Sequence, residues 1–254
     1  MFWQFLVRLI SGRPRPVRLP AGVPGIGLLP DYLLQEMHLL PNGNFSSTIT
    51  ASYAQWFEKA TLHELEAARA QIAERLSGAS RVLDVGAGSG QVSAALRRAG
   101  IHDIVALEPS PYLLQQAARA NPGIECVQAV IEDSKLPDRH FDGAAACFVF
   151  HEIPPREGNR ALSELHRILK PGGRLVIVEP SKTHFSLSWW RVWRRHGFRG
   201  LYFKALASRV YEPFVAEWHA RDHAAWLTEH GFTVEEDRDC MPWRMLTAIA
   251  TLRS

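Results

Sequence analysis

Apolar residues with a helical period mark the chain before residue 80. From Tyr53 to Leu76, apolar side chains recur at three- and four-residue intervals, which predicts one long amphipathic helix. A shorter helix is predicted from Asp31 to Leu40, because the Asp31 side chain can cap its first turn. The chain is therefore expected to place helices before its first strand.

Short apolar runs alternate with helical segments from residue 81 onwards. The runs predict strands at Arg81–Val85, Ile104–Leu107, Glu125–Ala129, Phe141–Phe150, Leu175–Val178, Gly231–Val234 and Met245–Leu252. The helical segments are Gln91–Arg98, Pro111–Ala120, Arg156–Leu169 and His219–His230. Strands separated by helices indicate a parallel sheet with right-handed crossovers. The expected fold is α/β, a doubly wound, mainly parallel seven-stranded sheet of Rossmann-like form with helical N-terminal and lid insertions.

The domain organisation follows from length and composition. With 254 residues, 46% of them hydrophobic, one substantial domain is expected over residues 51–254. Residues 1–50 are expected to form an extension with amphipathic and Pro/Arg-rich segments. Its Trp3 and Phe5 fit a peripheral membrane contact, whereas a flap packed on its own domain is the alternative. A lid-like insertion is expected at residues 181–215.

Charge and cysteine usage narrow the class. The net charge of +3 does not imply a global basic field for nucleic acid. The three cysteines show no C-x-x-C spacing, which argues against a zinc site and a disulfide framework and favours a reducing compartment. No apolar run has the length of a membrane span. A cytoplasmic protein is expected, with membrane association left open.

A glycine-rich loop follows the first predicted strand, in the stretch VLDVGAGSG. Glycines at such a strand-to-helix turn let a ligand lie directly on the backbone. The third glycine comes one residue too early for a dinucleotide fingerprint, and the G-K-[ST] of a phosphate loop is absent. Glu108 ends the second strand about 20 residues later, where one carboxylate suits a ribose diol. These features predict a nucleoside-like ligand without a pyrophosphate.

Four stretches in order carry a family resemblance. VLDVGAGSG, VALEPS, EDSKLPDRHFD and RILKPGGRLVIVEP, between Arg81 and Pro180, resemble the class I S-adenosylmethionine-dependent methyltransferases, and among them the type 11 group with small-molecule acceptors. The resemblance implies S-adenosylmethionine as cofactor. Methyl transfer from its sulfonium requires no metal, and the sequence shows no metal-ligand cluster, so no metal is expected. It implies that the methionine end is held by Asp84, Gly86, Ala87, Gly88 and Gly90.

The resemblance also implies the contacts of the adenosine end. Glu108 would bind the ribose hydroxyls, and Pro109 would lie beside the adenine. Val130 stands where the family has an acid that reads the adenine amino group. Ile131 is therefore expected to touch the ring with its backbone, and Glu132 or its neighbour Asp133 to reach the amino group.

The fourth strand ends in FVFHEIPP, which in similar methyltransferases borders the transferring methyl group. His151 and Glu152 are candidates for a general base or an acceptor-binding pair, since imidazole can deprotonate a hydroxyl near neutral pH. The alternative is that His151 shapes the pocket and Glu152 caps or packs a loop. Tyr53 and Trp56 are further candidates for closing the pocket.

Tryptophan and arginine interleave in SLSWWRVWRRHGFRGLYFKAL, within residues 181–215. A lid over an apolar acceptor, a contact with an anionic membrane, and stacking on RNA are three explanations, beside simple helix packing. The resemblance favours the lid. The expected function is methyl transfer to a small, partly apolar acceptor on oxygen or carbon, for which a quinone or lipid precursor is suitable. An RNA or protein methyltransferase and a non-catalytic binding module are the alternatives.

Overall fold

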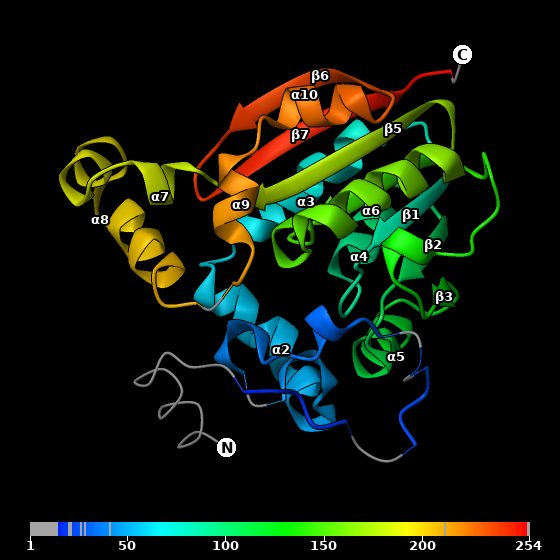
Figure 1. Ribbon diagram of the computed structural model, residues 1–254, viewed down its shortest axis with the longest axis horizontal. Coiled ribbons are helices and arrows are strands. Elements are labelled where there is room, and N and C mark those ends of the chain that lie inside the picture. The colour runs from blue at the N-terminus through cyan, green and yellow to red at the C-terminus, as the bar shows by residue number, and fades with distance from the viewer. Residues whose placement is uncertain are drawn as a thin grey trace.

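The computed structural model describes residues 15–19, 22–25, 27, 29–40, 42–210 and 212–252. The predicted membrane contact through Trp3 and Phe5 lies outside these residues, as does the side chain of Tyr53. One seven-stranded sheet forms the centre of the described fold, with the strand order β3-β2-β1-β4-β5-β7-β6 (Figure 1). This arrangement confirms the expected doubly wound α/β class.

Six of the seven strands run in the same direction, and β7 alone runs opposite to its neighbours β5 and β6. The parallel strands are β1 (Arg81–Val85), β2 (Asp103–Leu107), β3 (Glu125–Val127), β4 (Phe141–Cys147) and β5 (Leu169–Pro180). The reversed strand β7 (Trp243–Ala250) separates β5 from β6 (Phe232–Asp239), which has the direction of β5. The order of the parallel strands reverses between β1 and β4, the place where open α/β sheets bind their ligands.

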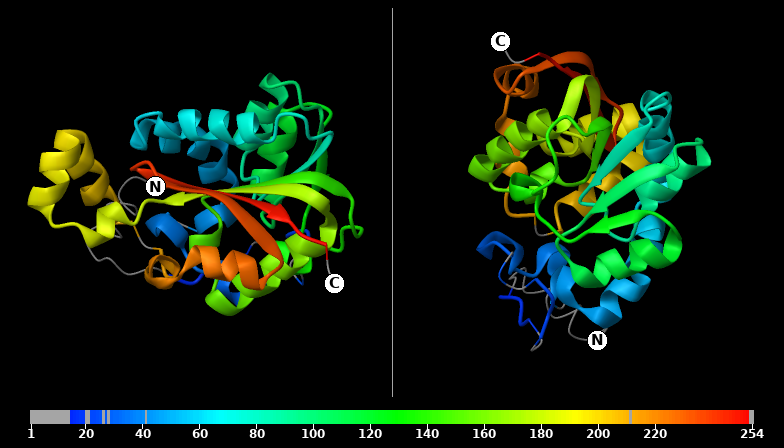
Figure 2. Two further views of the ribbon diagram at one scale, coloured as in Figure 1. Left: turned by 90° about the horizontal axis from the view of Figure 1, so that it is seen from above. Right: turned by 90° about the vertical axis from the view of Figure 1, so that its right-hand side faces the viewer.

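Helices cover both faces of the sheet (Figure 2). On one face lie α3 (Glu64–Arg75) and α4 (Gln91–Arg98), whose apolar residues pack with those of β1, β2, β4, β5 and β7. On the other lie α6 (Pro155–Ile168), α9 (Val215–Ala220) and α10 (His223–Glu229). The described residues also form the α-helices α2 (Ser47–Ala60), α5 (Pro111–Ala120), α7 (Thr183–Ser186) and α8 (Trp189–Ala207).

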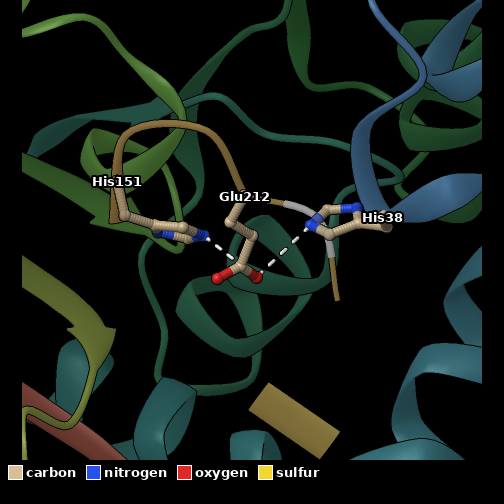
Figure 3. A group of neighbouring side chains, drawn as sticks. All are labelled: His38, His151 and Glu212. Atoms are coloured by element: carbon tan, nitrogen blue, oxygen red, sulfur yellow. Dashed lines mark ion pairs between the residues drawn. The ribbon is translucent and has the colours of Figure 1, made fainter. Parts of the chain in front are cut away.

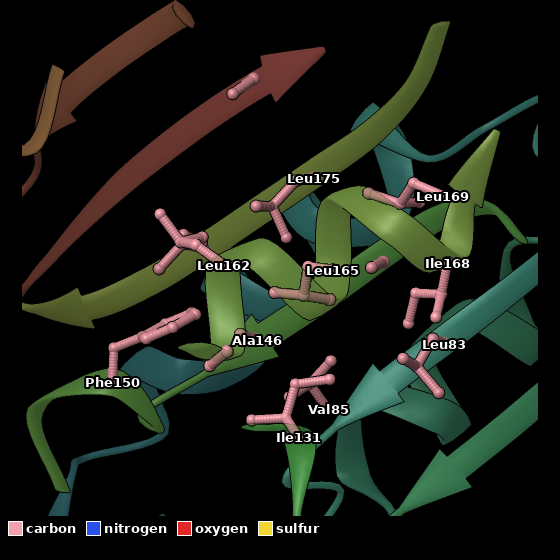
Figure 4. Packing of buried hydrophobic residues seen from close by; sticks show 14 of the residues in the cluster. Leu83, Val85, Ile131, Ala146, Phe150, Leu162, Leu165, Ile168, Leu169 and Leu175 are labelled. Atoms are coloured by element: carbon pink, nitrogen blue, oxygen red, sulfur yellow. The ribbon is translucent and has the colours of Figure 1, made fainter. Parts of the chain in front are cut away.

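The larger core lies between α6 and the sheet (Figure 4). Leu162, Leu165 and Ile168 of α6 are fully buried at three-residue intervals against Leu83 of β1 and Leu175 of β5. Burying such a leucine or isoleucine stabilises the fold by about 1.5–3 kcal/mol. This packing holds the carboxyl ends of the parallel strands in place. The loops that follow those ends line a cavity.

The predicted helix over Tyr53–Leu76 is two helices, α2 and α3. Leu62 and His63 between them have positive φ angles, of 50° and 59°. The hydroxyl of Thr61 donates to the Phe57 carbonyl oxygen at 2.8 Å, which satisfies a terminal carbonyl of α2. The apolar period continues across this break because both helices bury the same side, so periodicity alone could not reveal it.

Other predicted elements have different bounds. The predicted helix over Asp31–Leu40 consists of two 3₁₀ turns, η2 (Asp31–Leu33) and η3 (Met37–Leu39). The predicted helix over His219–His230 is divided into α9 and α10, because the Asp222 side chain accepts from the backbone N–H of Ala225 and starts a new helix. The fourth strand ends at Cys147, and the next residue, Phe148, has a φ of 60°.

The tryptophan-rich insertion lies at one end of the molecule, with α7 and α8 at the left of Figure 1. Val192 and Phe203 of α8 are buried against Met241, which lies between β6 and β7. The Tyr202 hydroxyl donates to the Ala60 carbonyl oxygen at 2.6 Å and ties α8 to the end of α2. The buried side of α8 therefore faces this turn between strands and not the carboxyl ends of β1 and β2.

The described part of the N-terminal extension packs on the domain. The Tyr32 hydroxyl donates to the Glu132 carboxylate at 2.6 Å, and the Gln128 side chain donates to the Pro24 carbonyl oxygen at 2.8 Å. The Ser110 hydroxyl donates to the carbonyl oxygen of Asn44. These contacts support the packed-flap interpretation for the described residues of the extension, which lie across the loops that follow β2 and β3.

Candidate active site

A cavity lies along the carboxyl ends of the parallel strands. Its volume is about 160 Å³, compared with about 10 Å³ for a second hollow beside Trp218 and Trp226. The loops after β1, β2, β3 and β4 all contribute to its wall, and η2, η3, α2 and α3 supply the opposite side. The position matches the reversal of strand order, so this is the candidate binding site.

The glycine loop forms the floor of the cavity. Gly86, Gly88 and Gly90 all have positive φ angles, of 60°, 53° and 85°. A Cβ on Gly86 would come within 2.7 Å of a methyl carbon of Val149, and one on Gly90 within 2.5 Å of the Asn121 amide nitrogen. A Cβ on Gly88 would meet only the Gly86 carbonyl oxygen, at 4.0 Å. Gly86 and Gly90 are therefore required by packing, whereas Gly88 leaves room for a ligand.

Glu108 lies one strand away from the loop and is 5% exposed. Its Oε2 accepts from the Gly88 backbone N–H and its Oε1 from that of Ser110, both at 2.9 Å. Burial raises the pKa of Glu108 to about 7 even though these two N–H groups favour the charged form. Each carboxylate oxygen keeps further acceptor capacity, which a vicinal diol could use.

Glu132 and Pro109 occupy the end of the cavity beyond β2 and β3. Pro109, Val130, Ile131 and Glu132 all line the wall. Glu132 Oε1 accepts from the Tyr32 hydroxyl, while its buried Oε2 has no hydrogen-bond partner among the described residues. Burial raises the pKa of this carboxyl group. Asp133 instead pairs with Lys135 at 2.7 Å and is about half exposed, so Glu132 is the acid placed on the cavity.

Asp84 lies beneath the glycine loop and is not on the cavity wall. Its Oδ2 accepts from both the backbone N–H and the hydroxyl of Ser93, at 2.9 Å and 2.6 Å. Burial raises the pKa of Asp84 to about 6. Asp84 thus places a negative group at the N-terminus of α4, where it interacts favourably with the helix dipole. By binding Ser93 it also holds the glycine loop between β1 and α4 in place. Its predicted contact with the methionine end remains a prediction.

His151 is fully buried and is also absent from the cavity wall. Its Nδ1 lies 2.5 Å from Glu179 Oε2, and its Nε2 lies 3.6 Å from Glu212 Oε1. Burial alone would lower the pKa of His151, but the carboxylates of Glu179 and Glu212 raise it well above its ordinary value. In this geometry His151 does not face the cavity, which disfavours its predicted role as a base in direct contact with an acceptor.

Glu152 does line the cavity, and it lies beside a histidine that the sequence did not single out. His38 Nε2 is 3.0 Å from Glu152 Oε1 and 3.7 Å from Glu212 Oε1. Burial alone would lower the pKa of His38, but Glu152 and Glu212 raise it. Figure 3 shows the rings of His38 and His151 on opposite sides of the Glu212 carboxylate. A row of alternating acids and imidazoles therefore connects the cavity wall to Glu179 on β5.

The wall beyond the glycine loop combines apolar and charged groups from the N-terminal helices. Phe57 and Phe148 pack edge to face there, with ring centroids 6.3 Å apart. Arg69 of α3 is 6% exposed and pairs with Glu58, and both residues line the cavity. Trp56, predicted to close the pocket, is instead 67% exposed, because on α2 its side chain points away from the side that presents Phe57.

The predicted lid does not line the cavity. None of the described residues between 181 and 215 belongs to its wall, and Glu212 of this segment reaches the neighbouring His38 and His151. Glu212, His38 and Arg69 were all missed in the sequence. His38 and Glu212 lie in short turns and loops without a period, and Arg69 resembles any other polar residue of a helix.

The donor groups on the wall fit the cofactor that the sequence implies. Glu108 offers acceptor capacity for a ribose diol, and the partnerless Oε2 of Glu132 suits the adenine amino group. Arg69 supplies a buried cation for a carboxylate, and Gly88 leaves open space at the loop. Hydroxyl, amino and carboxylate groups of S-adenosylmethionine thus each have a complementary group on the wall.

Comparison with known proteins gives the same assignment. Residues 83–177 match the methyltransferase domain family. A demethylmenaquinone methyltransferase from Clavibacter sepedonicus is 34% identical over 177 residues, which are 63% of this chain and 68% of that protein. Its counterpart from Paenarthrobacter aurescens (strain TC1) is 32% identical over 163 residues, 60% of this chain. The chain covers 62% of that second protein, slightly less than two thirds.

A solved structure extends the likeness of fold to almost the whole chain. It is the Burkholderia thailandensis 1,6-didemethyltoxoflavin-N1-methyltransferase with bound 1,6-didemethyltoxoflavin and S-adenosylhomocysteine. The TM-score is 0.57 at 20% sequence identity, and the match covers 94% of this chain and 95% of that chain. At this identity the likeness concerns the fold.

Proposed function

Because the chain belongs to the class I S-adenosylmethionine-dependent methyltransferases, we propose that it methylates a small, partly apolar acceptor on oxygen or carbon. One observation supports this most: a single cavity joins the glycine loop and Glu108 to the apolar Phe57 and Phe148. A hydroquinone ring suits such a wall, since it presents apolar faces with a hydroxyl at the edge. The relatives, which are named demethylmenaquinone methyltransferases, point to the same acceptor class.

In this proposal the chain's residues position the cofactor. When bound, S-adenosylmethionine supplies a methyl group already activated by a sulfonium, so the protein must mainly align the reactants. Glu108 accepts from the ribose hydroxyls, Glu132 accepts from the adenine amino group, and Arg69 binds the carboxylate. Gly88 lets the ligand approach the backbone without a side chain between them.

Glu152 is the residue best placed to handle the acceptor proton. It lines the cavity at the tip of β4, and His38 Nε2 lies 3.0 Å from its carboxylate. A carboxylate held by an imidazole can accept a hydroxyl proton directly. We therefore assign Glu152 as the candidate base, with His38 as the residue that orients it.

Isotope transfer tests this function directly. Purified full-length protein is incubated with methyl-labelled S-adenosylmethionine and a demethylated naphthohydroquinone, and the product is identified by mass spectrometry. We expect label in the ring carbon or hydroxyl product, and a Glu152→Gln variant to lose roughly 10²–10⁴-fold in rate with cofactor affinity retained. If label is transferred to added RNA or protein and to no small acceptor, the proposal is wrong.

Cofactor affinity should depend on pH through Glu108. Its pKa is raised to about 7, and only the ionised carboxylate can accept from both ribose hydroxyls. The affinity for S-adenosylhomocysteine should therefore fall as the pH drops below 7, by up to about tenfold per unit, and level off above 7. Isothermal calorimetry over roughly 1.5 pH units on each side of this pKa measures the affinity.

Glu108→Gln is the control for this titration. The variant keeps the shape of the side chain but loses the charge, so its affinity should be roughly 10–100-fold weaker than that of the wild type at high pH. Its pH dependence should be flat. A variant that keeps the wild-type slope would assign the titration to another group, such as Asp84.

We also propose that the exposed side of α8 contacts an anionic membrane. Trp189, Trp190 and Trp193 are 40–60% exposed there, and Arg194 and Arg195 lie exposed beside them. Tryptophan and arginine together suit the interface of an anionic bilayer. No helix of the described residues has the length and apolar character needed to span a membrane, so the proposed contact is peripheral.

Vesicle sedimentation tests the contact. The protein should bind vesicles that contain phosphatidylserine more tightly than vesicles of phosphatidylcholine alone. The Arg194→Glu/Arg195→Glu variant should lose at least about tenfold in affinity, because each cation near an anionic surface contributes about 1 kcal/mol. Arg98→Glu/Arg119→Glu makes the same charge change at exposed positions of α4 and α5. An equal loss in both variants would reject a local contact.

A further inference from the structure

Two histidines and one glutamate from three distant segments converge beside the cavity. His38 lies on η3, His151 on the turn after β4, and Glu212 between α8 and α9. One ligand atom from each of them lies within 4.8 Å of the others (Figure 3). We propose that these three side chains bind one divalent transition-metal ion, for which Zn²⁺ is the probe.

The orientation of His151 carries the proposal. Its Nδ1 lies 2.5 Å from Glu179 Oε2, and Glu179 Oε1 already accepts from the backbone N–H groups of Val149 and Phe150. Glu179 is thus an acceptor, so Nδ1 keeps its proton, and Nε2 is the nitrogen from which an ion would displace a proton to gain a lone pair. A histidine held by a carboxylate in this way is the usual arrangement at a metal centre, where the second nitrogen is the ligand.

The Nε2 atom of His151 is buried and has no hydrogen-bond partner among the described residues. It points at Glu212 Oε1 across 3.6 Å, and His38 Nε2 faces the same oxygen across 3.7 Å. Both separations are too long for hydrogen bonds. They are close to the roughly 3.4 Å that separates two ligand atoms each about 2.0–2.1 Å from a tetrahedral ion.

The types of ligand select the metal. Two imidazole nitrogens and one carboxylate form the set that zinc enzymes and non-haem iron proteins use, and they do not suit Mg²⁺ or Ca²⁺. Glu152 Oε1 lies 3.0 Å from His38 Nε2 but does not belong to the group of ligand atoms within 4.8 Å of one another, so the fourth position is left to water or to the acceptor. His38 and Glu152 line the cavity, so the ion would lie at its wall and could polarise an acceptor oxygen, a consequence that rests on the proposed function.

A second group of possible ligand residues serves as the internal comparison. Glu58, His63 and Glu66 also gather within ligand distance, but His63 and Glu66 are each 61% exposed. His63 is hydrogen-bonded to Glu66. Glu58 Oε2 is buried and has no hydrogen-bond partner among the described residues, but the same carboxylate is already paired with Arg69. His63→Gln therefore removes one histidine without touching the proposed site.

Metal binding is measured without any acceptor. Chelator-treated full-length protein is titrated with Zn²⁺ by calorimetry, and we expect one ion per chain. Glu212→Gln should weaken this binding by at least about a hundredfold, and His63→Gln should leave it unchanged. Glu212→Gln should also keep its affinity for S-adenosylhomocysteine, so loss of the ion is distinguished from loss of cofactor binding.

A measurement on the wild-type protein covers the event that Glu212→Gln does not fold. The ¹⁵N NMR signals of histidine Nε2 should shift for two residues on addition of one equivalent of Zn²⁺, and Co²⁺ should give the visible bands of a tetrahedral ion. The proposal is overturned if no ion binds, if Glu212→Gln binds it as well as the wild type does, or if two-histidine ligation is missing. The alternating acids and histidines from Glu152 to Glu179 would then be a set of imidazolium–carboxylate pairs.

Discussion

A Gly88→Arg variant should lose all measurable affinity for S-adenosylhomocysteine while keeping its fold. A Cβ at this position meets nothing closer than the Gly86 carbonyl oxygen at 4.0 Å, so the backbone can accept it without a clash. The φ of 53° makes any side chain there cost roughly 1–2 kcal/mol. The arginine side chain has to enter the cavity, because Gly88 lines its floor. Calorimetry measures the affinity, and circular dichroism confirms the fold.

Gly100→Arg is the matched control for that experiment. Gly100 also has a positive φ, of 88°, and a Cβ there has nothing within 4 Å. It follows the end of α4, whereas Gly88 precedes the start of that helix. The melting temperature of both variants should decrease by a similar amount, roughly 2–8 °C. Gly100→Arg should nevertheless keep the wild-type affinity for S-adenosylhomocysteine. Retained binding in Gly88→Arg would place the cofactor elsewhere.

Residues next to recognisable motifs could be predicted from the sequence. Gly88, Glu108 and Glu132 all line the cavity as expected, because strand ends in a parallel sheet are read from short apolar runs and glycine loops. Asp84 shows the limit of this approach. Its place at the end of β1 was predicted, but a sequence does not tell whether a carboxylate faces a ligand or, as here, the Ser93 amide and hydroxyl.

Residues in irregular segments could not be predicted. His38 has a φ of 55° in the middle of a 3₁₀ turn, and Glu212 precedes α9 in a loop. Neither residue belongs to a periodic pattern of apolar positions, and 174 positions of sequence separate Glu212 from His38. Only tertiary packing brings them to His151. The buried side of α8 packs on Met241, so the described part of the segment predicted as a lid does not line the cavity.

Glu179→Ala should destabilise the protein by about 3–5 kcal/mol, the largest stability effect expected of a single residue near the site. Glu179 is 1% exposed and accepts from the Val149 and Phe150 N–H groups at 2.9 Å and 2.7 Å, besides His151. Alanine leaves the three donors without their acceptor, and each unpaired buried group costs about 1–3 kcal/mol. Urea denaturation, with the midpoint and slope compared to the wild type, measures the loss.

Two further variants separate this buried role from a generic loss of charge. Glu235→Ala removes an exposed carboxylate whose partner Arg174 lies at 3.0 Å on the same sheet, and it should cost no more than about 1 kcal/mol. Glu179→Gln keeps an oxygen for the two backbone donors and should destabilise less than alanine does. The expected loss in the free energy of unfolding of Glu179→Ala is about 3–5 kcal/mol. A loss below about 1 kcal/mol would show that the turn after β4 does not depend on this carboxylate.

The same substitution links the fold to the site. The turn that Glu179 holds carries Val149, whose methyl carbon would lie 2.7 Å from a Cβ on Gly86, so the turn and the glycine loop are in close contact. Loosening the turn should therefore also weaken cofactor binding in Glu179→Ala. In Glu179→Gln the amide can donate to Nδ1 of His151, which moves the ring proton to Nε2 and removes the lone pair that the proposed ion needs. Zn²⁺ affinity should then fall in Glu179→Gln while the fold persists.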